Sequence, residues 1–162
     1  MRVNLIYNAS AGTAHRAPVN DLIHVLEVQG FSVLYSPTSS EADLDDVLRH
    51  PGELIVVAGG DGSVRAVARR LLDRPESPPA MAIVPLGTSN NIGRTLRLTE
   101  LAPVNALKGL NPANKCPFDV GRASGPWGER YFLESFGIGL LADLLRRYDP
   151  DAPKSVLRGV VP

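Results

Sequence analysis

The sequence contains a single cysteine, Cys116, which excludes a disulfide within the chain and is typical of a reducing cytosol. It also lacks an excess of charge, because 17 Lys and Arg residues are balanced by 17 Asp and Glu residues. Proteins that bind nucleic acid usually carry a basic surplus, so this balance argues against a nucleic-acid partner. The three histidines, His15, His24 and His50, are scattered and fit no metal-ligand spacing.

Long apolar runs are also missing. No run approaches the roughly 20 residues that a helix needs to cross a bilayer, and Met1 leads directly into a strand-like pattern rather than a signal peptide. The sequence therefore predicts a cytoplasmic protein without a transmembrane anchor. If it acts on a lipid, we expect it to do so peripherally at the membrane surface.

Short apolar strands alternate with amphipathic helices over most of the chain. The expected strands are residues 3–7, 31–35, 54–58 and 81–84, and the expected helices cover residues 19–30, 40–48, 63–71, 90–96 and 99–107. Strands that alternate with helices form parallel sheets with right-handed crossovers. We therefore predict an α/β domain, with a mostly parallel sheet flanked by helices, over residues 1–114.

The pattern changes after about residue 114. Residues 118–121 and 130–133 flank a turn at residues 123–128, which predicts an antiparallel hairpin. Residues 115–162 are thus expected to begin a β-rich second domain that is too short to be complete, so we expect a truncated chain. The sheet edges of such a hairpin invite pairing with another copy, which leaves a homo-oligomer open.

Three turns follow the carboxyl ends of predicted strands, where open α/β sheets bind ligands. They are Asn8–Gly12, Gly59–Ser63 and Pro85–Asn91, and all are rich in small and hydroxyl or amide residues. Each one alone also fits a plain turn or a helix cap. Because the three turns leave the same edge of one sheet, we expect them to converge on one crevice.

The middle turn, with the sequence GGDGS, is the most informative. Its glycines let successive N–H groups converge on an anion, and the helix that follows adds the positive end of its dipole. Asp61 places a negative charge at the same point, which suggests that a magnesium ion bridges the carboxylate to a phosphate. The alternative is that Asp61 only caps a helix while the glycines shape a tight turn.

These three turns, in this order, resemble the motifs of the diacylglycerol kinase catalytic-domain family. That family includes bacterial lipid kinases, sphingosine kinases and ceramide kinases, and it belongs to a superfamily with NAD kinases and phosphofructokinases. The resemblance covers residues 1 to about 122. The loop at Gly59–Gly62 is shared across the superfamily, whereas the longer motif at Pro85–Asn91 favours the lipid-kinase branch.

The resemblance implies that the chain binds ATP with Mg²⁺ and belongs to an enzyme that transfers the γ-phosphate to a diacylglycerol-like lipid hydroxyl. It implies a candidate catalytic and metal-binding role, direct or through water, for Asp61. The residues that it implies in ATP binding are Asn8, Ala9, Ser10, Ala11, Gly12, Thr38, Gly59, Gly60, Asp61, Gly62, Ser63, Val64, Arg65 and Thr88.

Two departures from the family pattern bear on activity. Arg65 stands where the family mostly has Asn, and Asn91 stands where it mostly has Asp. The resemblance also implies that the main catalytic carboxylate lies in a second domain, beyond residue 162. We therefore expect this chain to be inactive by itself. The alternatives are a degenerate module that binds a nucleotide or lipid without catalysis, or a relative of NAD kinases.

A further motif, Gly137–Ala142, matches the dinucleotide fingerprint GxGxxA. A dinucleotide site needs a following strand with an acidic residue about 20 positions on, and no such pattern follows. We therefore do not interpret this motif as an NAD site.

Overall fold

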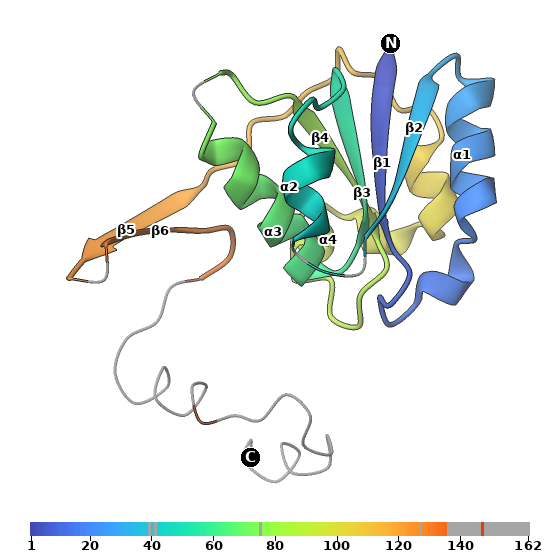
Figure 1. The fold of residues 1–162 in the computed structure, drawn as a ribbon. Helices are drawn as coiled ribbons and strands as arrows, with labels where there is room; N and C mark the ends of the chain where they lie inside the picture. The colour runs from blue at the N-terminus through green and yellow to red at the C-terminus, as the bar shows by residue number, and fades with distance from the viewer. Residues whose placement is uncertain (39, 41, 75, 127, 136–146, 148–162) are drawn as a thin grey trace, which may run out of the picture.

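A computed structural model describes residues 1–135 and 147, apart from residues 39, 41, 75 and 127. Its centre is a four-stranded parallel sheet in the order β2-β1-β3-β4 (Figure 1). The strands are β1 (Arg2–Asn8), β2 (Ser32–Thr38), β3 (Leu54–Gly59) and β4 (Ala80–Pro85). The predicted fold class, a parallel α/β sheet flanked by helices, is confirmed.

Helices cover both faces of the sheet, because the crossover connections between parallel strands place them there. The helices are α1 (Val19–Val28), α2 (Asp43–Val47), α3 (Asp61–Leu72) and α4 (Asn91–Thr95), with three short 3-10 helices at Ala14–Arg16, Leu98–Glu100 and Pro103–Leu107. Every residue of β3 is buried, as expected for a strand between two layers. No helix in the described part of the chain is long and apolar enough to cross a membrane.

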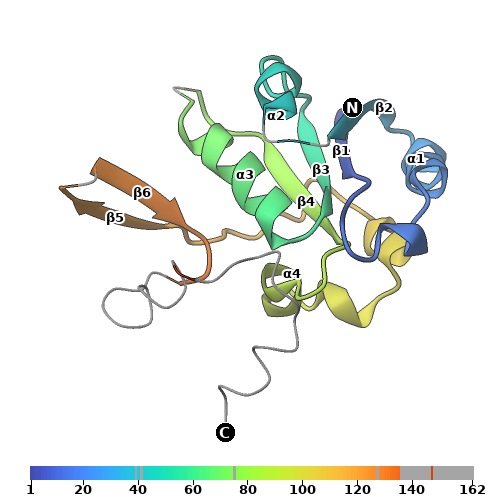
Figure 2. The same ribbon diagram turned by 60° about the horizontal axis from the view of Figure 1, so that its bottom comes forward.

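Two hydrophobic clusters lie on opposite faces of the sheet, because successive strand residues point to opposite sides. Leu5 and Val56 pack in the cluster that contains Leu22 and Leu26 of α1. Their strand neighbours Ile6, Ile55 and Val57 pack in the cluster that contains residues of α2, α3 and α4. Figure 2 shows α1 and α3 on opposite sides of the sheet.

Several predicted helix boundaries were wrong. The helix expected from Ser63 begins at Asp61, and the one expected from Ser40 begins at Asp43. The helix expected at residues 99–107 is instead two short 3-10 helices. Pro103 explains this break, since proline has no N–H to donate and disfavours helical backbone at the residue before it, and Ala102 is extended with ψ 142°.

The predicted hairpin is present in a different register. Strands β5 (Gly121–Gly125) and β6 (Gly128–Phe132) pair antiparallel, so residues 123–125 lie in a strand rather than in the expected turn. The ladder closes at Gly125 and Gly128, and Gly128 has the positive φ of 83° that a tight turn requires. Both views show the hairpin apart from the main sheet (Figures 1 and 2).

Candidate functional site

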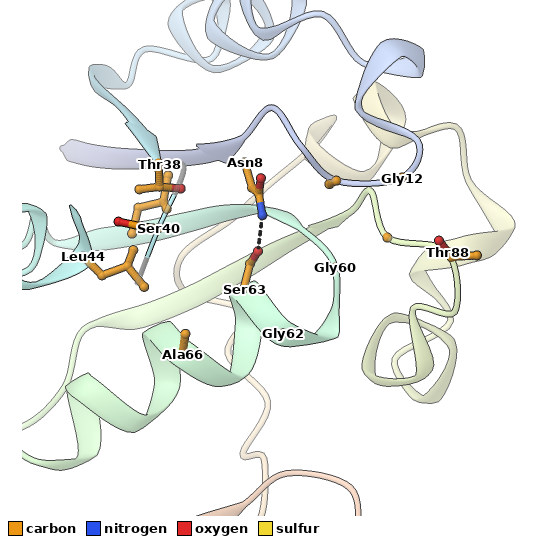
Figure 3. Close-up of a pocket in the computed structure, with 13 residues that line it drawn as sticks. Asn8, Gly12, Thr38, Ser40, Leu44, Gly60, Gly62, Ser63, Ala66 and Thr88 are labelled. Atoms are coloured by element: carbon orange, nitrogen blue, oxygen red, sulfur yellow. Dashed lines mark hydrogen bonds between the residues drawn. The ribbon is translucent and has the colours of Figure 1, made fainter. Parts of the chain in front are cut away.

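A cavity of about 410 Å³ opens at the carboxyl ends of the strands (Figure 3). It brings together residues from all three turns, so their predicted convergence on one crevice is confirmed. The residues that line the cavity are Ile6, Asn8, Ala11, Gly12, Thr38, Ser40, Leu44, Gly60, Gly62, Ser63, Ala66, Gly87 and Thr88.

The first turn is bonded to the other two. Asn8 donates from Nδ2 to the hydroxyl of Ser63 at 3.1 Å and accepts the N–H of Ser10 at 2.9 Å. Thr13 donates from both its backbone N–H and its hydroxyl to the carbonyl of Leu86, at 2.8 and 3.0 Å. The cavity wall is therefore a set of loops held by specific hydrogen bonds.

The second and third turns touch through two glycines. A Cβ atom on Gly87 would lie 2.6 Å from the Cα of Gly60 and 2.8 Å from Oδ1 of Asn90. Asn90 fixes this approach, because its side chain accepts the N–H of Gly87 at 2.7 Å and donates to the carbonyl of Gly87 at 2.8 Å. Asn90 also adopts left-handed backbone with φ 50°, which asparagine tolerates better than most residues.

Asp61 ties the same two turns together through its carboxylate. One oxygen accepts the N–H of Asn91 and the other accepts the N–H of Ile92, both at 3.0 Å. These are the first two N–H groups of α4, which have no partner within a helix. Asp61 therefore caps α4 rather than α3, the helix that it begins.

The described residues offer a metal ion few ligands. Among them, no group of three or more His, Cys, Asp or Glu side chains could hold a metal, and Asp61 does not line the cavity. Each carboxylate oxygen of Asp61 still has a lone pair available after accepting one N–H. This donor set fits a Mg²⁺ ion held by one carboxylate, water and phosphate oxygens, which is how magnesium usually binds beside phosphates.

Gly62 leaves an opening in the cavity floor. It is the second residue of α3, and a Cβ added there would meet no atom within 4 Å. Its φ is not in the positive range, and glycine costs about 1 kcal/mol relative to alanine inside a helix, so the fold itself does not call for glycine here. A ligand that approaches the N–H groups of the first turn of α3 would account for the missing side chain, and the helix dipole favours an anion there.

The other end of the cavity is largely apolar. Its walls are Leu44 and Ala66, and the hydroxyl residues Thr38 and Ser40 lie beside them (Figure 3). Of these four residues, the sequence predicts only Thr38 as part of the site. Leu44 falls in the amphipathic helix expected at residues 40–48, and nothing in that pattern distinguishes a residue of the cavity wall from a residue of the core.

Some residues that the resemblance implied lie outside the cavity lining. Ala9 and Ser10 are exposed on the first turn, and Arg65 is exposed on α3. Val64 is buried in the core, and its N–H is bonded to the carbonyl of Gly60 at 3.1 Å. Gly59 is also buried, where a Cβ would lie 2.6 Å from the hydroxyl of Ser63. The motif at residues 137–142 lies outside the described residues.

Comparison with known proteins identifies relatives that are named diacylglycerol kinase or lipid kinase. The family described as the diacylglycerol kinase catalytic domain matches residues 2–123. A diacylglycerol kinase of Bacillus subtilis is 25% identical over 162 residues, which is 96% of this chain. A diacylglycerol kinase of Staphylococcus haemolyticus is 30% identical over 145 residues, which is 86% of this chain.

A solved structure is similar as well. It is that of a candidate diacylglycerol kinase from Bacillus anthracis, and it superimposes with a TM-score of 0.53 and 28% sequence identity. The match covers 65% of this chain and 40% of that one. The chain spans about half the length of its relatives, with 51% of the Bacillus subtilis protein and 42% of the Staphylococcus haemolyticus protein covered.

Proposed function

Because the chain belongs to the diacylglycerol kinase catalytic domain family, we propose that its cavity binds the ATP of a lipid kinase reaction. In that reaction the terminal phosphate of ATP passes to a hydroxyl group of a diacylglycerol-like lipid. The observation that carries the proposal is the open position at Gly62. It lies in the cavity floor beside the first N–H groups of α3, where a phosphate would bind.

The two ends of the cavity match the two ends of a nucleotide. The glycine-rich end, formed by Gly12, Gly60, Gly62 and Gly87, lets phosphates come close to backbone N–H groups. The apolar end suits a base, with hydroxyl groups nearby for hydrogen bonds. A volume of about 410 Å³ lies within the range of small-molecule sites.

Asp61 is the residue of this chain that would hold Mg²⁺, through water or directly. When bound, the ion would neutralise charge on the phosphates. The hydroxyl of Ser63 accepts a hydrogen bond from Asn8, so its own hydrogen can be donated to a phosphate oxygen. Asn91 supplies no second carboxylate at this point, which makes Asp61 the acidic group on which this site would depend.

We also propose that two segments of the chain have different roles. Residues 1–114 would form the nucleotide-binding domain, and residues 115–162 would belong to a second, β-rich domain. By resemblance to the family, the main catalytic carboxylate would lie in that second domain, together with most contacts to the lipid acceptor. Transfer to the lipid would then need more than residues 1–162, and the protein would meet its substrate at the membrane surface.

Titration calorimetry and a transfer assay test the proposal together. We expect the 162-residue chain to bind ATP in the presence of Mg²⁺. A chimera that adds the unmatched half of the Bacillus subtilis relative is expected to phosphorylate diacylglycerol in vesicles. Binding without transfer in the chimera would favour the non-catalytic nucleotide-binding module. Formation of NADP from NAD would favour an NAD kinase relative, and no binding of ATP would refute the proposal.

Gly62→Ala is expected to weaken ATP binding at least about 10-fold, which corresponds to 1.4 kcal/mol, without loss of stability. The new methyl group would occupy the open position, whereas alanine in a helix stabilises the fold by up to about 1 kcal/mol relative to glycine. Calorimetry with ATP and thermal denaturation measure the two effects. Arg69→Ala, at an exposed position of the same helix, is the control and should bind ATP normally. Unchanged affinity in Gly62→Ala would remove the main support for a phosphate at this point.

A further inference from the structure

We propose that Arg70 is a positioning residue that sets the width of the apolar end of the cavity and thereby the affinity for the base of the nucleotide. This inference rests on the proposed nucleotide site. Arg70 does not line the cavity. Its guanidinium instead joins the two helices that carry the two walls of the apolar end.

Those walls are Leu44 of α2 and Ala66 of α3. Both side chains line the cavity, and both residues are nearly buried, with 4% and 7% of their surface exposed. Helix α2 has only 5 residues, Asp43–Val47, too few for a helix that is stable by itself. The position of Leu44 therefore depends on what holds α2 against the rest of the domain.

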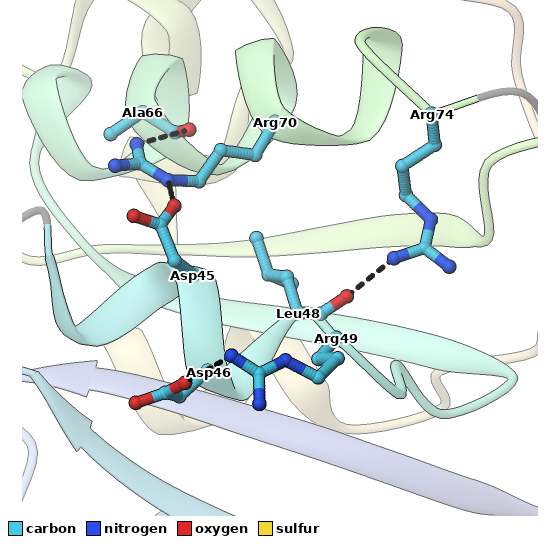
Figure 4. Close-up of polar contacts among 7 residues, drawn as sticks. All are labelled: Asp45, Asp46, Leu48, Arg49, Ala66, Arg70 and Arg74. Atoms are coloured by element: carbon cyan, nitrogen blue, oxygen red, sulfur yellow. Dashed lines mark hydrogen bonds and ion pairs between the residues drawn. The ribbon is translucent and has the colours of Figure 1, made fainter.

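Arg70 provides such a tie between α2 and α3 (Figure 4). Its Nε donates to Oδ1 of Asp45 at 2.6 Å, and its Nη1 donates to the carbonyl of Ala66 at 3.3 Å. Asp45 is the neighbour of Leu44, so one guanidinium is bonded next to one wall and to the backbone of the other. The Arg70 side chain is 21% exposed and that of Asp45 is 66% exposed, so the ion pair is shielded from water on the arginine side only.

Two other arginines of this region differ in what they join (Figure 4). Arg74 donates to the carbonyl of Leu48 at 2.5 Å, which ties the carboxyl end of α2 to the segment after α3. Arg49 pairs with Asp46 at 2.8 Å, but both belong to the same short segment and are 68% and 80% exposed. The Arg49–Asp46 pair therefore joins no two elements, and surface pairs of this kind contribute about 0–1 kcal/mol.

The other end of the cavity does not depend on α2. Gly60, Gly87 and Thr88 come from the loops that Asp61 and Asn90 hold together, and Gly62 lies at the start of α3. Loss of the Arg70 tie should therefore move Leu44 and leave the phosphate end intact. The expected signature is a selective one, because binding of the base should suffer while binding of a bare triphosphate chain should not.

The test compares ATP with inorganic tripolyphosphate by calorimetry on the full 162-residue chain with Mg²⁺. Arg70→Ala is expected to weaken ATP binding at least about 5-fold, or about 1 kcal/mol, and to change tripolyphosphate binding less than about 2-fold. Arg49→Ala, the matched control, should bind both ligands like the wild type. The swap Arg70→Asp with Asp45→Arg restores opposite charges and should recover part of the ATP affinity that Arg70→Asp alone loses, and a double-mutant cycle measures this coupling.

The outcomes separate this inference from the proposed function. If the wild type binds ATP and Arg70→Ala binds it equally well, or loses both ligands to the same extent, the positioning role is refuted. If the wild type binds no ATP, the proposed function fails first. Should Arg70→Ala not fold, Asp45→Asn removes the charge from the exposed side of the pair. Asp45→Asn is expected to show the same selective loss, and normal ATP affinity in this variant would overturn the inference.

Discussion

Gly87→Ala is expected to destabilise the protein by about 2–3 kcal/mol, the range for an overpacked site that cannot relax easily. The new Cβ would lie 2.6 Å from the Cα of Gly60, and backbone cannot turn aside as a side chain can. It would also lie 2.8 Å from Oδ1 of Asn90, the group that holds the turn in place. Urea denaturation followed by circular dichroism measures the loss of stability.

The control for this prediction is Gly62→Ala, which adds the same methyl group to the same cavity without a clash. The two glycines should give opposite results. Gly87→Ala should lose stability, whereas Gly62→Ala should keep it and lose ATP affinity. If Gly87→Ala were as stable as the wild type, the close approach of the second and third turns would be refuted.

Asp61→Ala is expected to lose about 2 kcal/mol of stability, even with no metal present. The substitution leaves the N–H groups of Asn91 and Ile92 without their acceptor, and a helix cap is worth about 0.5–2 kcal/mol, with hydrogen bonds to charged groups at the upper end. Thermal denaturation in EDTA measures this effect apart from Mg²⁺. The stability of Asp61→Asn should lie between those of the wild type and Asp61→Ala, because the amide keeps one oxygen as an acceptor and replaces the other with a donor.

This prediction changes how an inactive Asp61 variant should be interpreted. If Asp61 served a metal alone, Asp61→Ala would be as stable as the wild type in EDTA. If it serves as the cap of α4, stability falls in EDTA as well, and the loss of ATP binding partly reflects a displaced third turn. The control is a substitution of Thr95, whose hydroxyl donates to the carbonyl of Asn91 inside α4. Its stability in EDTA separates general damage to α4 from loss of the cap.

The strands and the crevice could be predicted from the sequence because they depend on local patterns. The run Leu54–Gly59 is apolar throughout, and in the structure it is buried on both faces. The glycine and asparagine turns follow such strands, and parallel strands place their carboxyl ends at one edge of a sheet. Their convergence therefore required no knowledge of individual contacts.

The bonds between the turns could not be predicted in the same way. Asp61 caps a helix that begins 30 residues later, and a side chain that caps a distant helix has no local signature. From the sequence, Asp61 is predicted to be either a metal ligand or the cap of the adjoining helix, whereas in the structure it caps α4. The apolar end was missed for a similar reason, because Leu44 and Ala66 fit a plain core pattern until α2 and α3 are placed together.

Arg70 shows a further limit of sequence analysis. The basic residues Arg65, Arg69 and Arg70 follow the glycine loop closely, and Arg65 is the one that the resemblance implies in ATP binding. In the structure Arg65 is exposed, whereas Arg70 is largely buried and bonded to Asp45, 25 residues earlier in the chain. Arg70 differs from Arg65 because the fold brings it close to Asp45, and its distance along the sequence from the glycine loop does not reveal this contact.

The position of the cavity along the chain has a consequence for synthesis. All residues that line it lie between Ile6 and Thr88, and the hairpin begins only at Gly121. A nascent chain leaves the ribosome from its amino end, and domains usually fold in that order. The residues that form the cavity therefore leave the ribosome before the hairpin does. A nucleotide that bound the cavity at that stage would stabilise the growing chain by mass action.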